Sequence, residues 1–148
     1  MKYVLGLGTN MGERIENLKN AVDALNHIPQ TAVQRLSAVY ETSPVGYARQ
    51  QDFYNCAVLC ESALEPHEML GVCLGIESGL GRVRNFKNGP RIIDIDLLLA
   101  EEKIIKTPNL IVPHPHIRER LFVLLPMLDL FDSGVAVSYT HLRAHETC

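Results

Sequence analysis

The chain has 148 residues, of which 47% are hydrophobic and 21% charged, and its formal net charge is −3. This length suits one domain with its own hydrophobic core, and the composition is that of a globular protein rather than a disordered or fibrous one. The overall field of a slightly acidic chain does not attract nucleic acid or an anionic membrane, so anion binding would require a local basic cluster.

The cysteines and the first residues bear on the cellular compartment. Cys56, Cys60, Cys73 and Cys148 have the spacing of neither a zinc site nor a small disulfide framework, so we expect buried thiols in a reducing environment. The first residues do not resemble a signal peptide, and their apolar stretch is far too short to span a membrane. We therefore expect a cytoplasmic protein.

Hydrophobic periodicity predicts the elements of the first half of the chain. Residues 3–7 form a β-prone run that ends in a glycine-rich turn. Apolar residues recur at three- and four-residue steps over 13–26, which predicts a helix. Residues 31–41 favour a strand that breaks at the Thr-Ser-Pro-Val-Gly run over 42–46. Residues 53–61 predict a strand whose two faces are both largely buried.

The second half continues with a helix and a strand. Pro66 favours a helix start, and the apolar pattern predicts an end near Gly79. Residues 92–99 predict a further strand, and 119–125 a last helix that Pro126 limits. The order β-α-β-β-α-β is typical of the ferredoxin-like fold, an α+β class in which both helices cover one face of an antiparallel sheet. The opposite face would then be open to a ligand.

The strand over 92–99 carries two acidic residues, Asp94 and Asp96, within the most apolar part of the chain. Because side chains alternate along a strand, the two carboxylates share a face and lie roughly 6–7 Å apart. Like charges at this spacing repel and resist desolvation, so they favour a bound cation. Their geometry suits one or two Mg²⁺ ions that also bind waters and phosphates. The alternative is a solvated sheet edge that merely carries two acids.

A basic cluster lies directly before this strand. Arg82, Arg84, Lys87 and Arg91 place four cations in ten residues, with glycines on either side that would allow the segment to move as a flap. Arginine can bind phosphate with two parallel hydrogen bonds and can neutralise charge that develops during phosphoryl transfer. Such a run is more often a solvated loop. Beside a pair of metal-binding acids, it indicates a phosphate site.

Further groups that could face phosphate follow at 112–122. We expect His114 to face the ligand, with Arg120 and Phe122 nearby. A lone histidine is more often structural, and metal binding by His114 and His116 is not favoured because no third soft ligand is evident. The glycine-rich run over 6–12 fits the dinucleotide fingerprint poorly, since its third glycine is one residue late, and is interpreted as a turn.

Taken together, these residues resemble the 6-hydroxymethyl-7,8-dihydropterin pyrophosphokinase family of folate biosynthesis over roughly residues 2–128. The motifs that carry the resemblance are Gly-Leu-Gly-Thr-Asn-Met-Gly (6–12), Tyr-Glu-Thr-Ser-Pro-Val-Gly (40–46), Gln-Asp-Phe-Tyr-Asn (51–55), Gly-Arg-Val-Arg (81–84), Gly-Pro-Arg-Ile-Ile-Asp-Ile-Asp (89–96) and Val-Pro-His-Pro (112–115). The Gly-Pro-Arg-x-x-Asp-x-Asp run is specific to the family, whereas Asp-x-Asp by itself is not.

The resemblance implies an activity and a set of site residues. The enzyme would transfer a diphosphate from ATP to the hydroxymethyl group of 6-hydroxymethyl-7,8-dihydropterin, giving AMP and the pterin diphosphate. Two Mg²⁺ ions would be bound by Asp94 and Asp96. The residues implied for the pterin are Phe53 and Phe122, which would stack on its ring, Asn55, which would bind its edge, and the backbone near Thr42 and Val45. The residues implied around ATP are Glu77, Arg84, Arg91, Leu97, His114 and Arg120. Arg82, Arg84 and Arg91 would be catalytic.

Domain organisation and rival functions complete the expectations. We expect one pyrophosphokinase domain over 1–130 that acts as a monomer, with neither nucleic acid nor membrane as a partner. The segment 131–148 has no apolar periodicity and is expected to be atypical, either non-native or disordered. One rival is a non-catalytic module that senses a small molecule or binds RNA, although the charge and the lack of an RNP-type motif weaken the RNA version. Another is a nucleotidyl or phosphoryl transferase with a different substrate.

Overall fold

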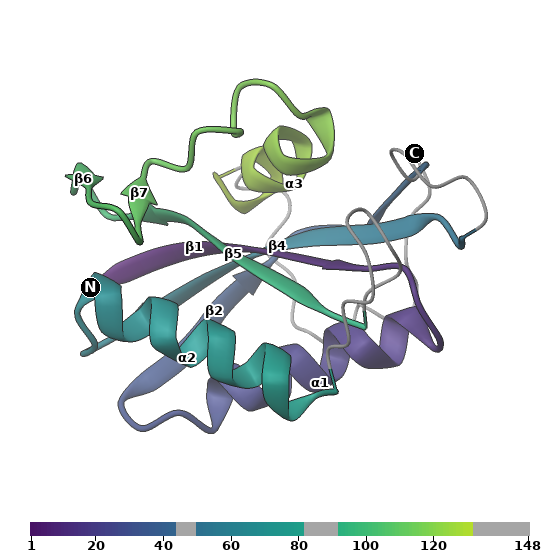
Figure 1. Ribbon diagram of the computed structural model, residues 1–148, viewed down its shortest axis with the longest axis horizontal. Coiled ribbons are helices and arrows are strands. Elements are labelled where there is room, and N and C mark those ends of the chain that lie inside the picture. The colour runs from purple at the N-terminus through teal and green to yellow at the C-terminus, as the bar shows by residue number, and fades with distance from the viewer. Residues whose placement is uncertain (44–49, 82–91, 132–148) are drawn as a thin grey trace.

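The computed structural model describes residues 1–43, 50–81 and 92–131. Figure 1 shows a twisted antiparallel sheet with two helices, α1 and α2, on one face and α3 on the other. The elements in chain order are β1 (Lys2–Thr9), α1 (Arg14–Asn26), β2 (Thr31–Leu36), β3 (Tyr40–Thr42), β4 (Phe53–Ser62), α2 (Pro66–Gly79), β5 (Asp94–Ala100), β6 (Ile105–Lys106), β7 (Ile111–Val112) and α3 (Leu121–Phe131). No helix in these ranges has the length and hydrophobicity that a membrane span requires.

The main sheet has the order β2-β4-β1-β5, with every neighbouring pair antiparallel, and β3 also pairs with β4. With α1 after β1 and α2 after β4, this is the ferredoxin-like βαββαβ arrangement, so the predicted fold is confirmed. β1 lies in the centre of the sheet. β5 lies at an edge, because it pairs with no second strand among the described residues.

Alternation along the strands divides the apolar side chains between two layers. The layer under α1 and α2 contains Tyr54, Cys56, Val58 and Cys60 from β4, together with Leu18, Val22, Met69 and Ile76 from the helices. The layer under α3 contains Val4, Ala57, Leu98, Met127 and Leu130. Each fully buried Val, Leu, Ile or Met side chain among them contributes roughly 1.5–3 kcal/mol through removal from water. The two buried faces predicted for β4 are therefore confirmed.

Helix α3 continues through Pro126 to Phe131, so the predicted limit at this proline is wrong. A proline inside a helix removes one hydrogen bond and crowds the preceding turn. Here the following turn places Met127 and Leu130 against the sheet, where both are buried. Burial of these two side chains offsets the cost of the proline inside the helix. The sequence pattern alone did not reveal this burial.

Two side-chain contacts fasten the end of α3 to β2 and β3. Arg35 Nη1 donates a hydrogen bond to the carbonyl oxygen of Leu130 at 2.7 Å. The Tyr40 hydroxyl donates to Asp129 Oδ2, also at 2.7 Å. The helix therefore covers part of the sheet face that was expected to be fully open. Within the described residues, Gly6, Gly8, Phe53 and Asn55 on this face still line a cavity together with the first half of β5.

Two of the predicted β segments have different bounds in the structure. The strand expected over 31–41 is two strands, since Ser37 interrupts the ladder: its Oγ accepts the hydrogen bond from the backbone nitrogen of Ala57 at 2.7 Å. The run that was interpreted as a turn from residue 6 onward is partly strand, because Gly6 and Gly8 lie inside β1. Glycine inside a strand commonly marks a close approach of other groups, which is the case at the site described below.

The buried thiols lead to a first prediction. Cys56, Cys60 and Cys73 are unpaired and buried, as expected, and burial raises the pKa of each thiol from 9.0 to about 12. Because the thiolate is the nucleophile, we expect these three residues to resist iodoacetamide in the native protein and to react fully in guanidinium chloride. Mass spectrometry of the alkylated peptides measures each position separately. Labelling of Cys56 under native conditions would contradict the packing described here.

Candidate active site

One cavity of about 1160 Å³ extends across the uncovered part of the sheet and over the edge strand β5 toward α2. Pockets for a single ligand commonly have roughly 300–1,000 Å³, so this one has room for two small molecules. Its lining comes from β3, β4 and α3, from β1 and β5, and from α2 and the β7 region. The main lining residues are Thr42, Phe53, Asn55, Phe122, Gly6, Gly8, Asp94, Asp96, Leu70, Leu74, Glu77, Ile111 and His114.

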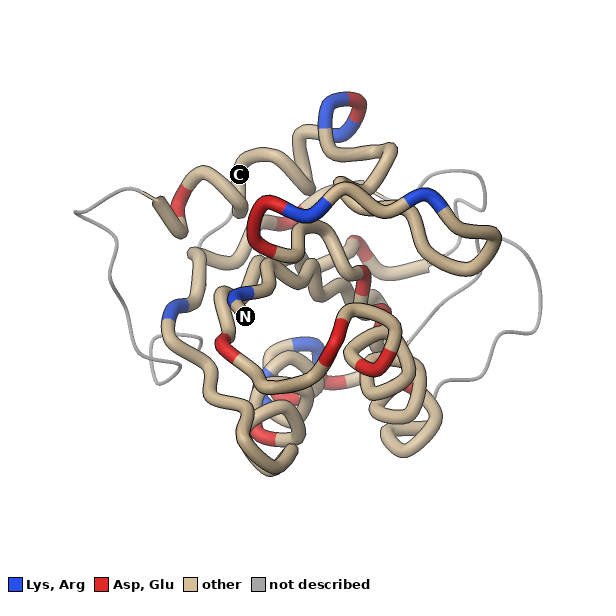
Figure 2. Tube along the Cα trace, turned by 90° about the vertical axis from the view of Figure 1, so that its left-hand side faces the viewer, with Lys and Arg blue, Asp and Glu red and all other residues tan. Residues whose placement is uncertain are grey.

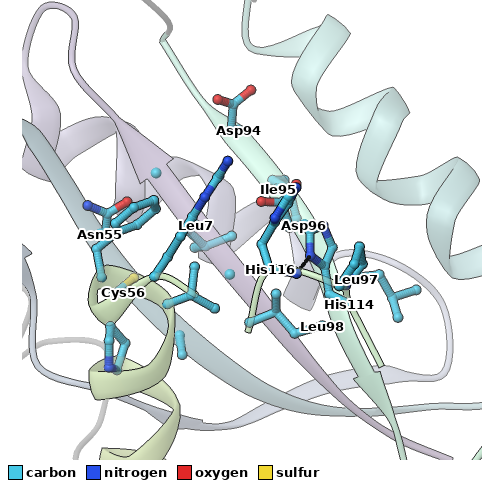
Figure 3. Close-up of a pocket in the computed structure, with 18 of the residues that line it drawn as sticks. Leu7, Asn55, Cys56, Asp94, Ile95, Asp96, Leu97, Leu98, His114 and His116 are labelled. Atoms are coloured by element: carbon cyan, nitrogen blue, oxygen red, sulfur yellow. Dashed lines mark hydrogen bonds between the residues drawn. The ribbon is translucent and has the colours of Figure 1, made fainter. Parts of the chain in front are cut away.

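Asp94 and Asp96 both line the cavity and lie along one strand (Figure 3). Ile95 between them is buried in the layer under α1 and α2, so the two carboxylates point to the opposite face of the sheet. Asp94 is half-buried and Asp96 is exposed. The shared face follows from strand alternation, as expected. β5 lies at a sheet edge, as in the alternative of an edge strand that merely carries two acids, and the cavity at these carboxylates is the observation that favours a ligand site.

The two glycines of β1 form a floor beside the carboxylates. Gly8 is the register partner of Asp94, and Gly6 is the partner of Asp96. A Cβ atom at Gly6 would come within 3.2 Å of Leu98, and one at Gly8 within 3.0 Å of Asn55 Oδ1. The absence of side chains here leaves the backbone of Gly6 and Gly8 next to the acid pair and leaves space for the amide of Asn55.

Asn55 lies on the other side of β1 from the aspartates, on β4 (Figure 3). Its side chain is only 7% exposed, and its Nδ2 donates a hydrogen bond to Thr42 Oγ1 at 3.0 Å. This bond directs Nδ2 toward β3 and Oδ1 toward Gly8. Phe53 lies on the same face of β4 and Phe122 comes from α3; both rings are half-buried and line the cavity.

His114 lies beside Asp96 at the edge of the sheet (Figure 3). Its backbone nitrogen donates to the carbonyl oxygen of Leu98 at 3.0 Å, which holds the residue against β5. Its Nδ1 accepts a hydrogen bond from the backbone nitrogen of His116 at 3.2 Å, so the ring proton is on Nε2. Burial lowers the pKa of His114, and the charges of His116 and Arg120 act in the same direction against the attraction of Asp96. A neutral imidazole that donates through Nε2 is the result.

Comparison with known proteins decides the family. The family model for 7,8-dihydro-6-hydroxymethylpterin-pyrophosphokinase (HPPK) matches residues 4–132. The chain belongs to this family. Membership confirms the resemblance and makes the protein an ATP-dependent pterin pyrophosphokinase of folate synthesis, with ATP and a pterin as substrates.

Individual relatives agree with the family model. The chain is 44% identical over 126 residues to the 2-amino-4-hydroxy-6-hydroxymethyldihydropteridine pyrophosphokinase of Bacillus subtilis, a match that covers 85% of this chain and 75% of the relative. The enzyme of the same name from Methylorubrum extorquens is also 44% identical, with 85% and 80% covered. The folic acid synthesis protein FOL1 of Dictyostelium discoideum is 41% identical over 97% of this chain, which spans 21% of that longer protein.

Four of the residues expected to contact pterin in an HPPK line the cavity. Thr42, Phe53, Asn55 and Phe122 come from three separate elements and all line it. Val45, the remaining residue expected there, lies outside the described residues. Their contacts with a pterin therefore stay predictions.

The residues expected around ATP lie on both sides of β5. Glu77, Leu97, His114 and Arg120 line the cavity, and the Arg120 guanidinium is 5.6 Å from the centre of the Phe122 ring. Arg82, Arg84 and Arg91 of the predicted basic cluster lie outside the described residues. Elsewhere in the described chain the Lys and Arg residues are scattered, apart from the neighbours Arg118 and Arg120 (Figure 2).

Several cavity residues were missed from the sequence. The glycine floor could have been found from the two-residue spacing of Gly6 and Gly8 within an apolar strand. The apolar part of the lining formed by Leu70, Leu74 and Ile111 left no local signal, because these residues come from α2 and β7 and meet only in the folded chain.

Proposed function

We propose that Asp94 and Asp96 of this HPPK bind two Mg²⁺ ions between a pterin site on β4 and an ATP site over the edge of β5. The observation that carries the proposal is the position of the acid pair in one cavity, which aromatic and amide groups from β4 and α3 line together with apolar side chains from α2 and β7. The donor set fits the metal, because Mg²⁺ in nucleotide sites is bound through one or two carboxylates, waters and phosphate oxygens. Within the described ranges no group of three or more His, Cys, Asp or Glu residues forms a larger metal site.

The pterin site is supported by the cavity residues from β3, β4 and α3. Two half-buried rings, Phe53 and Phe122, would enclose a flat heterocycle, and offset stacking of aromatic rings is favourable by about 0.5–1.5 kcal/mol beyond burial. Asn55 would accept a hydrogen bond from the ring through Oδ1, since Nδ2 is held by Thr42. The backbone near Thr42 and Val45 would complete the edge contacts.

The ATP site is supported by cavity residues from α2, from β7 and from the segment that follows β7. Leu74 and Ile111 are 54% and 48% exposed and would cover the adenine ring with apolar surface, together with Leu70 and Leu97. His114 Nε2 and Arg120 would donate hydrogen bonds to phosphate oxygens. Glu77 also lines the cavity. With ATP bound to these residues, its phosphate chain would extend across β5 toward the pterin.

The chemistry follows from this order of groups. The pterin hydroxyl would attack the β-phosphorus in line with the bond to the α-phosphate, so that AMP leaves. Mg²⁺ bound at the acid pair would neutralise charge on the phosphate oxygens. Arg82, Arg84 and Arg91 would stabilise the charge on the transferred group and on the departing AMP. No strong base is required from the protein, because positioning of the two substrates supplies most of the rate.

We also propose that the protein acts as a monomer in the cytoplasm. Location in the cytoplasm is supported by the three unpaired thiols, which are typical of a reducing compartment.

The identity of the nucleotide product tests the transfer step. With ATP, Mg²⁺ and 6-hydroxymethyl-7,8-dihydropterin, we expect AMP and the pterin diphosphate to form in equal amounts, because the bond between the α- and β-phosphates breaks. Separation of nucleotides by ion-exchange chromatography measures the products. Formation of ADP instead would indicate transfer of a single phosphoryl group, the rival enzymatic activity. Binding of the pterin without turnover would indicate a sensor.

A further inference from the structure

The carboxylate of Glu77 contacts the protein backbone at the acid pair. Glu77 lies in the last turns of α2 and is only 7% exposed. Its Oε2 accepts a hydrogen bond from the backbone nitrogen of Ile95 at 2.7 Å, and this buried bond joins residues 18 apart in the chain. Ile95 is the residue between Asp94 and Asp96. A side chain expected near ATP is thus bonded to the strand that carries the aspartates.

The edge position of β5 explains why this contact matters. Among the described residues β5 pairs with β1 alone, and Ile95 lies opposite Leu7. In an antiparallel strand alternate N–H groups point away from the neighbour, and at a sheet edge these groups need another acceptor. The outward N–H of Ile95 obtains it from Glu77. A buried backbone N–H without an acceptor is rare in folded proteins, because its desolvation is then not compensated.

The same edge has a second anchor further along. The backbone nitrogen of His114 donates to the carbonyl oxygen of Leu98 at 3.0 Å, near the other end of β5. Among the described residues, Glu77 and His114 therefore hold the outer edge at two points, and Glu77 provides the one at the acid pair. The directions of both aspartate side chains depend on the backbone at Ile95, because Cα–Cβ bonds alternate about the strand.

We propose that Glu77 is a positioning residue that fixes the backbone of β5 at Ile95 and thereby aims Asp94 and Asp96 at Mg²⁺ and the phosphates. The inference rests on the proposed function in one respect, the metal role of the aspartates. A charged acceptor forms a shorter and stronger hydrogen bond than a neutral one, which favours a carboxylate at this position. Glutamine would keep the acceptor oxygen without the charge.

Hydrogen exchange tests the positioning role without substrate or metal. In the ligand-free protein, Glu77→Ala is expected to speed exchange of the Ile95 amide by about tenfold or more, because the edge bond that protects it is lost. Glu77→Gln should show a much smaller change. The control is Glu102→Gln, an exposed acid beyond the far end of β5, which should leave the Ile95 amide unchanged. NMR exchange rates measure all three variants, and circular dichroism verifies that each is folded. An unchanged Ile95 rate in Glu77→Ala would overturn the proposal.

Metal binding gives the second readout, with Mn²⁺ alone as the paramagnetic probe. We expect Glu77→Ala to weaken Mn²⁺ binding by about tenfold, as for loss of groups that orient metal ligands, and Glu77→Gln to restore most of it. Unaltered Mn²⁺ affinity in Glu77→Ala, with weaker binding in Asp96→Asn, would overturn the positioning role alone. No loss in Asp96→Asn, or no Mn²⁺ binding to the wild type, would instead contradict the proposed metal site. A raised KM for ATP with unchanged Ile95 exchange would mean that Glu77 acts only through the nucleotide.

Discussion

Replacement of Asp96 by asparagine is expected to lower kcat by at least about a thousandfold, which corresponds to roughly 4 kcal/mol of transition-state stabilisation. The amide has nearly the same shape as the carboxylate but lacks the negative charge that binds Mg²⁺. Asp96 is exposed in the cavity, while its neighbours Ile95 and Leu97 are buried and remain unchanged. Catalysis should therefore be lost without loss of the fold. Steady-state kinetics over a range of Mg²⁺ concentrations measure the effect.

Matched variants distinguish the effect of removing a negative charge at the site from the effect of removing one elsewhere. Asp94→Asn should also reduce kcat strongly, since Asp94 shares the face and the cavity with Asp96. Asp23→Asn on α1, on the other face of the sheet (Figure 1), removes the same charge far from the cavity and should leave kcat unchanged. Near-normal kcat in Asp96→Asn would exclude this side chain from metal binding.

Gly8→Ala is expected to weaken pterin binding by about tenfold to a hundredfold, roughly 1.4–3 kcal/mol. The added methyl group would come within 3.0 Å of Asn55 Oδ1 and 3.8 Å of the Phe53 ring. Asn55 is nearly buried and is held by its bond to Thr42, so it cannot move away without losing that bond. The added methyl group would therefore displace the amide and the ring that are proposed to bind the pterin, and this displacement would lower the affinity.

The chain offers a matched control for this variant. Gly71 lies in α2, where an added Cβ meets no atom within 4 Å, so Gly71→Ala should leave binding unchanged and should stabilise the helix slightly. Fluorescence titration with the pterin measures both variants. Equal pterin affinity in Gly8→Ala and the wild type would show that Asn55 can adjust and that the glycine floor is not required.

The parts of the fold that depend on local pattern were predictable. The start of α2 was expected at Pro66, and the structure adds reciprocal bonds between Glu65 and Glu68 that cap this end. Alternation along β4 assigned its side chains to two faces, and both faces are buried in the structure. These features depend on neighbours two to four residues apart, which a sequence displays directly.

The errors arose where tertiary packing outweighed a local signal. The helix was expected to end at Pro126. In the structure it continues to Phe131, because Met127 and Leu130 are buried against the sheet. Gly6 and Gly8 were interpreted as part of a turn, although their role is to leave space beside β4 and β5. In each case the local preference was real, and the contact that opposed it involved a residue far away in the chain.

The sequence by itself determined which residue types are available and that Asp94 and Asp96 share one face of a strand, because the period of a strand is a local property. Family membership followed from the same motifs. Only the tertiary structure decided that β5 is an edge strand, that Thr42 orients Asn55, and that Glu77 binds the backbone between the aspartates. Strand order and contacts between distant elements arise from packing of the whole chain, and no periodicity in a short window encodes them.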